Sequence, residues 1–293
     1  MPNHRAGFVN IIGNPNVGKS TLMNLLIGEN LSIVSHKIQT TRRTIRGIIN
    51  EPDYQIVFSD TPGILKPTYL LQEKMLKFIE TSLIDADIIL FVTEAGEKFT
   101  QEDVLLKIKA AGVPVILVIN KIDLIDQPKL EKIVAEWHER LNPEMIIPVS
   151  AKTKFNHQPI ITGVLKYLPE SPPYFPKEQI SDLTERFFAA EKIREKIFHW
   201  YQQEIPYSVE VQIEEYKVLP EIIHINAIIF VERKSQAGIL IGHQGESLKR
   251  VGTLARRDIE LFNAKKVMLN LRVKVKEDWR NNPDTLKEFG YEG

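Results

Sequence analysis

Short apolar runs alternate with longer segments of helical spacing over residues 1–170. Runs that are apolar throughout, rather than at every second position, are typical of strands buried on both faces of a sheet. The expected strands are FVNII, TIRGII, QIVFS, IILFVT, VPVILVIN and MIIPVS. Because segments with helical spacing follow several of them, the pattern predicts a mostly parallel sheet with helices on both faces.

A proline-rich stretch ends this region. YLPESPPYFPKEQISD, from Tyr167 to Asp182, contains four prolines and no apolar periodicity. Proline lacks the backbone N–H and fixes φ, so this stretch does not continue a helix or lie inside a sheet. We therefore predict a first domain at 1–170, a linker at 171–182 and a second domain at 183–293.

The pattern after the linker predicts an α+β domain. RFFAAEKIREKIFHWYQQE has helical spacing, and VEVQIEE and HINAIIFVE alternate as strands do. A helical segment, AGILI, precedes a helix from about Glu246 to Phe262 and a last strand, VMLNLRVKVK. The apolar side chains expected on one face of that strand are Val267, Leu269, Leu271, Val273 and Val275.

Composition limits the partners and the chemistry. The 38 basic and 38 acidic residues cancel, so any basic surface is local. The absence of cysteine excludes disulfides, thiolate nucleophiles and cysteine-ligated metals. The N-terminal MPNHRAGFVN has no secretory apolar core, and the longest apolar stretches are far short of the roughly 20 residues that span a bilayer. We expect a cytoplasmic protein.

A glycine-rich loop predicts a phosphate site. GNPNVGKS, from Gly13 to Ser20, matches G-x-x-x-x-G-K-[ST] between an expected strand and an expected helix. Glycines let backbone N–H groups surround phosphate oxygens, and the helix N-terminus adds partial positive charge. We expect Lys19 to reach the β and γ phosphates and Ser20 to bind Mg²⁺. The expected nucleotide contacts in this loop are Gly13, Asn14, Pro15, Asn16, Val17, Gly18, Lys19, Ser20 and Thr21.

Two loops at the ends of later strands predict a guanine site. Asn120, Lys121 and Asp123 belong to NKID, which follows VPVILVI, and open α/β sheets bind ligands at such strand ends. The Asp123 carboxylate can accept hydrogen bonds from N1–H and the 2-amino group of guanine, whereas adenine would leave the charge unpaired. The second loop, whose backbone N–H groups we expect near the base, comprises Ser150, Ala151 and Lys152.

DTPG, which closes the strand QIVFS, predicts a Mg²⁺ and γ-phosphate contact. The D-x-x-G pattern is common by chance. Its place after a strand and between the other motifs is therefore the evidence for a nucleotide contact. We expect Asp60 to hold Mg²⁺ through water and the Gly63 N–H to sense the γ phosphate. Further expected nucleotide contacts here are Thr61, Pro62 and Ile64.

The polar stretch from Gln39 to Arg42, QTTR, lies between the glycine-rich loop and DTPG. It predicts the mobile segment called switch I, with Thr41 as the Mg²⁺ ligand. A solvated loop is the alternative interpretation. The residues that we expect to act in catalysis are Lys19, Thr41, Asp60 and Gly63.

The order GNPNVGKS, TTR, DTPG, NKID and SAK resembles the translation-factor-related GTPases. LTERFFAAEKIREKIF and IGHQGESLKRVGTLARRD extend the resemblance, now to the Era family, over essentially the whole chain. The resemblance implies a Ras-like P-loop GTPase domain followed by a type II KH domain. It also implies GTP and GDP binding with Mg²⁺, GTP hydrolysis, and binding of the 3′ end of small-subunit ribosomal RNA during assembly of that subunit. We further expect a monomer with peripheral contact at the inner face of the cell membrane.

The second domain contains a GxxG loop, Gly242 to Gly245, between a helical segment and a helix. In type II KH domains this loop clamps a nucleotide backbone. From Arg233 to Arg280 twelve basic residues stand against five acidic ones, a local net charge of +7. A solvated helix face is the alternative explanation of these charges. The expected RNA contacts are Ile241, Gly242, His243, Gln244, Gly245, Lys249, Arg250, Arg256 and Arg257.

Two positions depart from related patterns. His243 and Gln244 occupy the variable pair of the GxxG loop, where many Era-like loops carry lysine, so backbone N–H groups would carry more of the phosphate contact. Ile64 follows DTPG, where Ras-like enzymes place the glutamine that orients the attacking water. In relatives with the same asparagine in the phosphate loop a K⁺ ion lies between the phosphates, which makes Asn16 a candidate K⁺ ligand.

Three other functions remain open at this point. A GTPase of the same group could act on another RNA, such as a tRNA-modification substrate. The chain could instead be an RNA chaperone that uses GTP as a structural ligand with negligible turnover. A membrane-trafficking switch is disfavoured because the sequence carries no lipidation signal and no basic amphipathic N-terminal helix.

Overall fold

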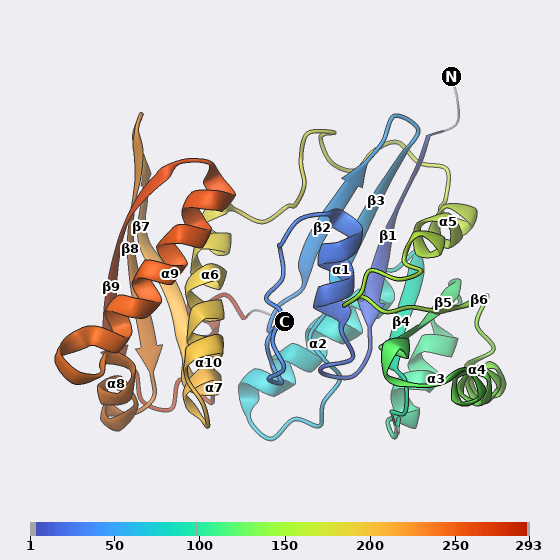
Figure 1. Cartoon of the computed structure of the whole chain (residues 1–293), viewed down its shortest axis with the longest axis horizontal. Helices are drawn as coiled ribbons and strands as arrows, with labels where there is room; N and C mark the ends of the chain where they lie inside the picture. Colours follow the sequence, from blue (N-terminus) through green and yellow to red (C-terminus); the bar gives the residue numbers. More distant parts are fainter. Residues whose placement is uncertain (1–3, 98, 292–293) are drawn as a thin grey trace.

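The computed structural model describes residues 4–97 and 99–291. Figure 1 shows two units side by side, and the first contains a six-stranded sheet of order β2-β3-β1-β4-β5-β6. Its strands are β1 (Arg5–Ile12), β2 (Ile45–Asn50), β3 (Tyr54–Asp60), β4 (Ile88–Glu94), β5 (Val115–Asn120) and β6 (Met145–Pro148). Only the β2–β3 pair is antiparallel among these described neighbours, so the predicted mostly parallel sheet is confirmed.

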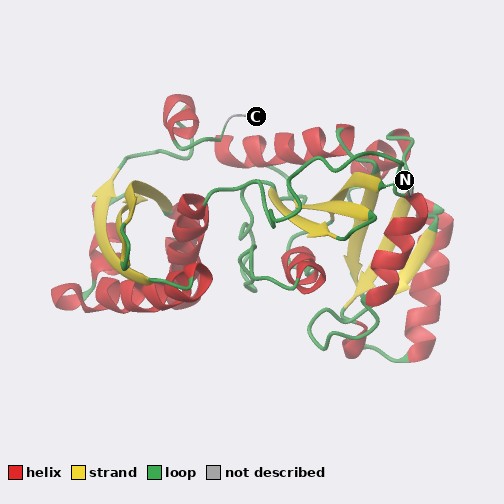
Figure 2. Ribbon diagram, turned by 90° about the horizontal axis from the view of Figure 1, so that it is seen from above, coloured by secondary structure: helices red, strands yellow, loops and turns green. Residues whose placement is uncertain are grey.

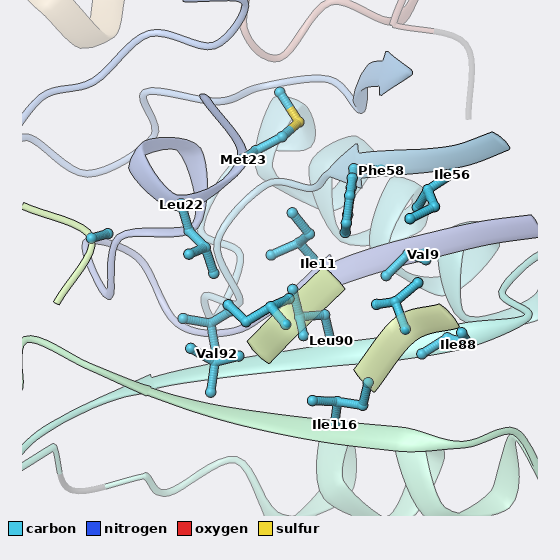
Figure 3. Packing of buried hydrophobic residues seen from close by; sticks show 14 of the residues in the cluster. Val9, Ile11, Leu22, Met23, Ile56, Phe58, Ile88, Leu90, Val92 and Ile116 are labelled. Carbon is cyan, nitrogen blue, oxygen red and sulfur yellow. The ribbon is translucent and has the colours of Figure 1, made fainter. Parts of the chain in front are cut away.

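Helices cover both faces of this sheet. They are α1 (Lys19–Ile27), α2 (Leu70–Ile84), α3 (Glu102–Ala110), α4 (Gln127–Leu141) and α5 (Gln158–Tyr167), with a 3₁₀ turn η1 (Ile122–Leu124). One hydrophobic cluster joins α1 and α5 to the strands, and another joins α2, α3 and α4 to the opposite face. Figure 3 shows the first cluster, in which Leu22 of α1 lies over strand residues such as Ile11 and Val92.

The second unit has the helix, strand, strand, helix, helix, strand order that the sequence predicts. Its sheet has the order β7-β8-β9, antiparallel between β7 and β8 and parallel between β8 and β9. The elements are α6 (Glu185–Trp200), α7 (Ile205–Ser208), β7 (Glu210–Val218), β8 (Ile222–Val231), α8 (Lys234–Ile241), η2 (His243–Gly245), α9 (Glu246–Asn263), β9 (Lys266–Val275) and α10 (Pro283–Glu288). The expected apolar face of β9 is buried or half-buried as far as Val273, but Val275 is exposed because it lies at the strand end.

The proline-rich segment lies along the β2–β3 edge of the first unit. The Gln55 side chain donates to Phe175 O (2.8 Å) and accepts from Tyr174 N (2.7 Å). Arg46 forms an ion pair with Asp182 at 2.6 Å. The segment is therefore held in place by hydrogen bonds that no local spacing rule would reveal, and the boundaries 1–170, 171–182 and 183–293 remain a prediction.

The segment after β9 bridges both units, which the sequence analysis missed. Trp279 and Phe289 pack in one cluster with Leu71 and Met75 of α2. The Leu71 N–H donates to Arg280 O at 3.0 Å. Figure 2 shows the two units from above, with loop segments running between them. Isolated aromatic residues without periodicity gave no sign of this packing.

None of the helices within the described ranges is both long and apolar enough to cross a lipid bilayer.

We expect Trp279→Ala to lower the free energy of unfolding by about 3–5 kcal/mol, the usual cost of truncating a buried tryptophan. The indole is 0% exposed, and its Nε1 donates to Ser208 O at 2.9 Å. Urea unfolding followed by circular dichroism measures the change. Trp200→Ala is the matched control, because Trp200 is 39% exposed and its loss should cost less than about 1 kcal/mol. Equal losses in the two variants would contradict the packing described for Trp279.

Candidate nucleotide site and RNA-binding loop

The loop between β1 and α1 packs too tightly for side chains at two positions. A Cβ on Gly13 would lie 2.1 Å from Val92 O, and one on Gly18, where φ is +98°, would lie 2.2 Å from Asn120 Nδ2. Helix α1 begins directly after Gly18, and no side chain caps its first turn. Such a helix start presents unpaired N–H groups and partial positive charge, which suits an anion.

Lys19 lies inside this loop. Its Nζ donates to Gly13 O (3.0 Å) and Asn14 O (2.9 Å). Burial lowers the pKa of Lys19 to about 8, and the negative charges of Asp60 and Glu97 oppose that shift. A desolvated ammonium gains most from nearby anions, so phosphate oxygens fit this position.

Ser20, Thr41 and Asp60 meet beside Lys19. Asp60 Oδ2 accepts from Ser20 Oγ (2.6 Å) and Thr41 Oγ1 (3.1 Å), and the two hydroxyl oxygens are 3.0 Å apart. Burial raises the pKa of Asp60, while Lys19 and the hydroxyl groups oppose the rise. Asp60 Oδ1 is buried and makes no hydrogen bond with any described residue. The structure thus brings together the three side chains that the sequence assigns to Mg²⁺.

Asn120 joins the loops expected around the base. Its Nδ2 donates to Val17 O (2.8 Å), and its Oδ1 accepts from Ala151 N (3.0 Å). The structure therefore holds NKID and SAK against the phosphate loop. The Asn120 side chain therefore links the phosphate loop to the SAK loop and fixes the position of one relative to the other.

Of the other residues of these two loops, Asp123 and Lys152 are exposed and Lys121 is half-buried, whereas Ser150 is buried. Lys121 adopts φ +62° and pairs with Glu94. The Asp123 carboxylate is exposed and forms no hydrogen bond or ion pair within the described ranges. Ser150 Oγ accepts from Thr153 N at 3.3 Å, and Lys152 is exposed.

The DTPG segment packs its backbone on the phosphate loop. Thr61 Oγ1 donates to Ile11 O at 2.7 Å. A Cβ on Gly63 would lie 2.7 Å from Pro15 Cα, so only glycine fits there without displacement. Ile64 is buried: its side chain is 2% exposed within a hydrophobic cluster, and its N–H donates to Gly13 O at 3.1 Å, while its contact with nucleotide stays a prediction.

Glu97 is a site neighbour that the sequence analysis missed. Its carboxylate accepts from Asn14 Nδ2 and, at 2.7 Å, from Thr93 Oγ1. It also contributes to the electrostatic environment of Lys19. No motif surrounds Glu97, so only the folded chain reveals this contact.

Switch I faces the second unit on its other side. The Arg42 guanidinium is 2% exposed, and its Nη1 donates to Val209 O (2.6 Å) and Glu210 Oε2 (3.1 Å). Arg194 Nη2 donates to Thr40 O at 2.6 Å. Asn16 Nδ2 donates to His36 O at 2.9 Å, which links the phosphate loop to the chain three residues before switch I. These contacts hold the segment in place, in contrast to the solvated loop that remained open as an alternative.

The GxxG loop has the backbone conformations that favour glycine. Gly242 has φ +73°, and a Cβ there would lie 2.3 Å from Ser247 Oγ. Gly245 has φ +81° with open space around its Cβ position, and Gln244 has φ +48°. The side chains exposed around the loop are Ile241, His243, Gln244, Lys249, Arg250, Arg256 and Arg257.

Fewer basic side chains are free to bind an anion than the local net charge of +7 indicates, because several form ion pairs. On β9, Arg272 and Lys274 both pair with Glu214. Lys276 and Arg280, which follow, pair with Glu288 and Glu232 respectively. On α9, in contrast, Lys249, Arg250 and Arg257 form no ion pair with any described acidic residue, and Arg256 is 4.0 Å from Glu260. The uncompensated charge therefore extends along α9, with Lys249 and Arg250 nearest to the GxxG loop, and continues to Lys265 and Lys266 beyond the far end of the helix.

Comparisons with known proteins agree with this architecture. A family model described as 50S ribosome-binding GTPase matches residues 8–121, and one described as KH domain matches residues 204–280. GTPase Era of Alkaliphilus metalliredigens (strain QYMF) is 44% identical over 293 residues, which cover 99% of each chain.

Two solved Era structures match over 99% of this chain and 100% of theirs. One is Era in complex with MgGDPNP and nucleotides 1506–1542 of 16S ribosomal RNA, with 40% identity and a TM-score of 0.95. The other is a variant of Aquifex aeolicus Era bound to GDP·AlF₄⁻, with 39% identity and a TM-score of 0.94. The resemblance inferred from the motifs is confirmed, and the chain belongs to the Era family of GTPases, with a Ras-like GTPase domain followed by a KH domain.

Proposed function

We propose that this chain binds and hydrolyses GTP and binds the 3′ end of small-subunit ribosomal RNA during assembly of that subunit. The observation that carries the proposal is the presence, in one chain, of a Lys19–Ser20–Thr41–Asp60 cluster and a GxxG loop flanked by uncompensated cations. An Era structure that contains both MgGDPNP and a 16S ribosomal RNA fragment matches the chain at a TM-score of 0.95.

The residues around Asp60 fit a magnesium ion. The buried Asp60 Oδ1 has no hydrogen-bond donor among the described residues. The hydroxyls of Ser20 and Thr41 donate to the other carboxylate oxygen, Asp60 Oδ2. Hydroxyl and carboxylate oxygens are ligands that Mg²⁺ accepts, directly or through water. We propose that Ser20 and Thr41 ligate Mg²⁺ and Asp60 holds it through water, and that the bound ion neutralises phosphate charge.

The remaining site residues take separate roles in this proposal. Lys19 binds the β and γ phosphates, and the Gly63 N–H contacts the γ phosphate. The exposed Asp123 carboxylate binds the guanine edge. The Ala151 N–H supports the base loop through Asn120 Oδ1, at 3.0 Å. The Ile64 side chain is buried and apolar, so other groups must orient the water that attacks the γ phosphate.

The RNA strand, in this proposal, passes the GxxG loop. Backbone N–H groups there, with exposed Lys249, Arg256 and Arg257 on α9, would contact phosphates. The domain limits 1–170, 171–182 and 183–293 are supported by one hydrophobic cluster whose members all belong to the second unit. We also propose a monomer in the cytoplasm with peripheral contact at the inner face of the cell membrane; composition supports the location, and the family resemblance supports the membrane contact.

Base selection is expected to depend on Asp123. Asp123→Asn should weaken GTP binding by at least about 100-fold, since two charge-assisted hydrogen bonds to guanine are lost. The same variant should gain affinity for xanthosine triphosphate, whose 2-oxo group accepts from the amide. Titration of both nucleotides into both proteins provides an internal control. Equal affinity of the unmodified chain for ATP and GTP would rule out the guanine assignment.

RNA binding is expected to fall by more than about 10-fold in Gly245→Asp, because a carboxylate would stand where a phosphate passes. Gly112→Asp is the matched control: Gly112 has φ +68° and open space at its Cβ, but lies in the first unit. Fluorescence anisotropy with a ribosomal 3′-end oligonucleotide measures both. If the two variants bind this RNA equally well, the RNA site lies elsewhere.

We also propose that Asn16 binds K⁺ through its side-chain oxygen, because its Nδ2 is engaged by His36 O at 2.9 Å and the residue is exposed. A bound K⁺ would supply the charge that an arginine finger supplies in other GTPases. Phosphate release should be faster in KCl than in NaCl at equal ionic strength, and Asn16→Ala should remove the difference while keeping GTP affinity. Identical rates of the unmodified chain in both salts would exclude this role.

A further inference from the structure

An exposed tryptophan lies at the end of α6, and an arginine of α9 stacks on it. Trp200 is 39% exposed, whereas Trp137 and Trp279 are 5% and 0% exposed. The guanidinium carbon of Arg250 lies 3.6 Å from the centroid of the Trp200 ring. At that distance the guanidinium is in van der Waals contact with the face of the indole ring. Most cation–π pairs have a longer separation.

Neighbouring contacts fix this pair beside the GxxG loop. Tyr201 Oη donates to Leu240 O at 2.6 Å, two residues before Gly242. Burial raises the pKa of Tyr201, and a hydrogen bond with the Ser247 side chain opposes the rise. Figure 1 shows α6 and α9 side by side, with α8 at their lower end. The end of α6 is thus anchored against both helices that flank the loop.

The chemistry of the pair suits a nucleobase. Arg250 forms no ion pair with a described carboxylate, in contrast to Arg272 and Arg280 in the same unit. Its planar guanidinium is weakly hydrated and stacks readily on flat rings. Bases of single-stranded RNA stack on aromatic side chains and on guanidinium planes. A solvent-exposed stacked pair next to a backbone clamp therefore offers a surface for an unpaired base.

We propose that Trp200 and Arg250 form a stacking platform for one unpaired base of the RNA strand that the GxxG loop clamps. The platform rests on the proposed RNA binding and adds to it a contact with a base rather than with the phosphate backbone. Trp200 holds the guanidinium flat, and the base stacks against the pair. The contact is tolerant of base identity, because every base has a π face.

Binding of a ribosomal 3′-end oligonucleotide to the full chain tests the platform. Trp200→Ala should weaken binding by about 5- to 100-fold, the range measured for loss of one base–aromatic stack, and Trp200→Phe should recover much of the loss. The slope of affinity against salt concentration should stay the same, since no phosphate contact is removed. Circular dichroism confirms that each variant is folded.

A charge-conserving pair of variants separates stacking from phosphate binding. Arg250→Lys keeps the positive charge but removes the planar group, so it should lose at least about 5-fold in affinity. Arg257→Lys, seven residues further along the same helix, is the matched control and should bind RNA nearly as the unmodified chain does. An Arg250→Lys variant with unchanged affinity would reduce Arg250 to a phosphate contact and overturn the platform.

Tryptophan fluorescence gives a second readout. Because Trp200 is the exposed tryptophan of the three, bound RNA should shield the fluorescence from acrylamide, and Trp200→Phe should abolish this shielding. RNA that binds without shielding, or Trp200→Ala with unchanged affinity, overturns the platform while leaving RNA binding intact. An unmodified chain that binds no RNA overturns both the platform and the proposed function.

Discussion

The buried carboxylate of Asp60 is the interaction around which the nucleotide site is organised. It accepts hydrogen bonds from Ser20 of the phosphate loop and Thr41 of switch I, so three segments distant in sequence meet at one group. Burial makes its charge costly, and Lys19 and two hydroxyls offset that cost only in part. Such a group favours a cation, which is why the same cluster that stabilises the loops also fits Mg²⁺.

Adjacent residues of switch I connect this cluster to the second unit. Thr41 faces Asp60, whereas the next residue, Arg42, is enclosed by Val209 O and the Glu210 carboxylate. A buried guanidinium that loses its partners is strongly destabilising, so the position of Arg42 constrains the peptide that carries Thr41. The Lys37 ammonium also donates a hydrogen bond to Tyr201 O at 2.5 Å, and Tyr201 contacts Leu240, two residues before the GxxG loop. The nucleotide site and the RNA loop therefore share one short segment of chain.

Sequence reasoning located the fold and the positions of the motif residues because phosphate binding requires fixed residue types at fixed spacing, and because apolar periodicity identifies strands and helices. It predicted Lys19, Ser20 and Asp60 in one site, and the structure brings these side chains together. It missed Glu97 beside Asn14, because that contact joins distant segments and follows no spacing rule. The contacts of Arg42 with Val209 O and Glu210 and the packing of Trp279 on α2 were not predicted from the sequence for the same reason. The burial of Ile64 escaped it as well, since a motif does not show which way a side chain points.

Multiple-turnover phosphate release from GTP with Mg²⁺, by the unmodified chain and by Lys19→Ala, tests the central claim most directly. The claim is that the loop containing Lys19 holds the phosphates during hydrolysis, where removal of the ammonium leaves developing negative charge without its cation. The account predicts sustained release by the unmodified chain and none above background by a folded Lys19→Ala variant. Equal turnover by the two proteins would contradict it.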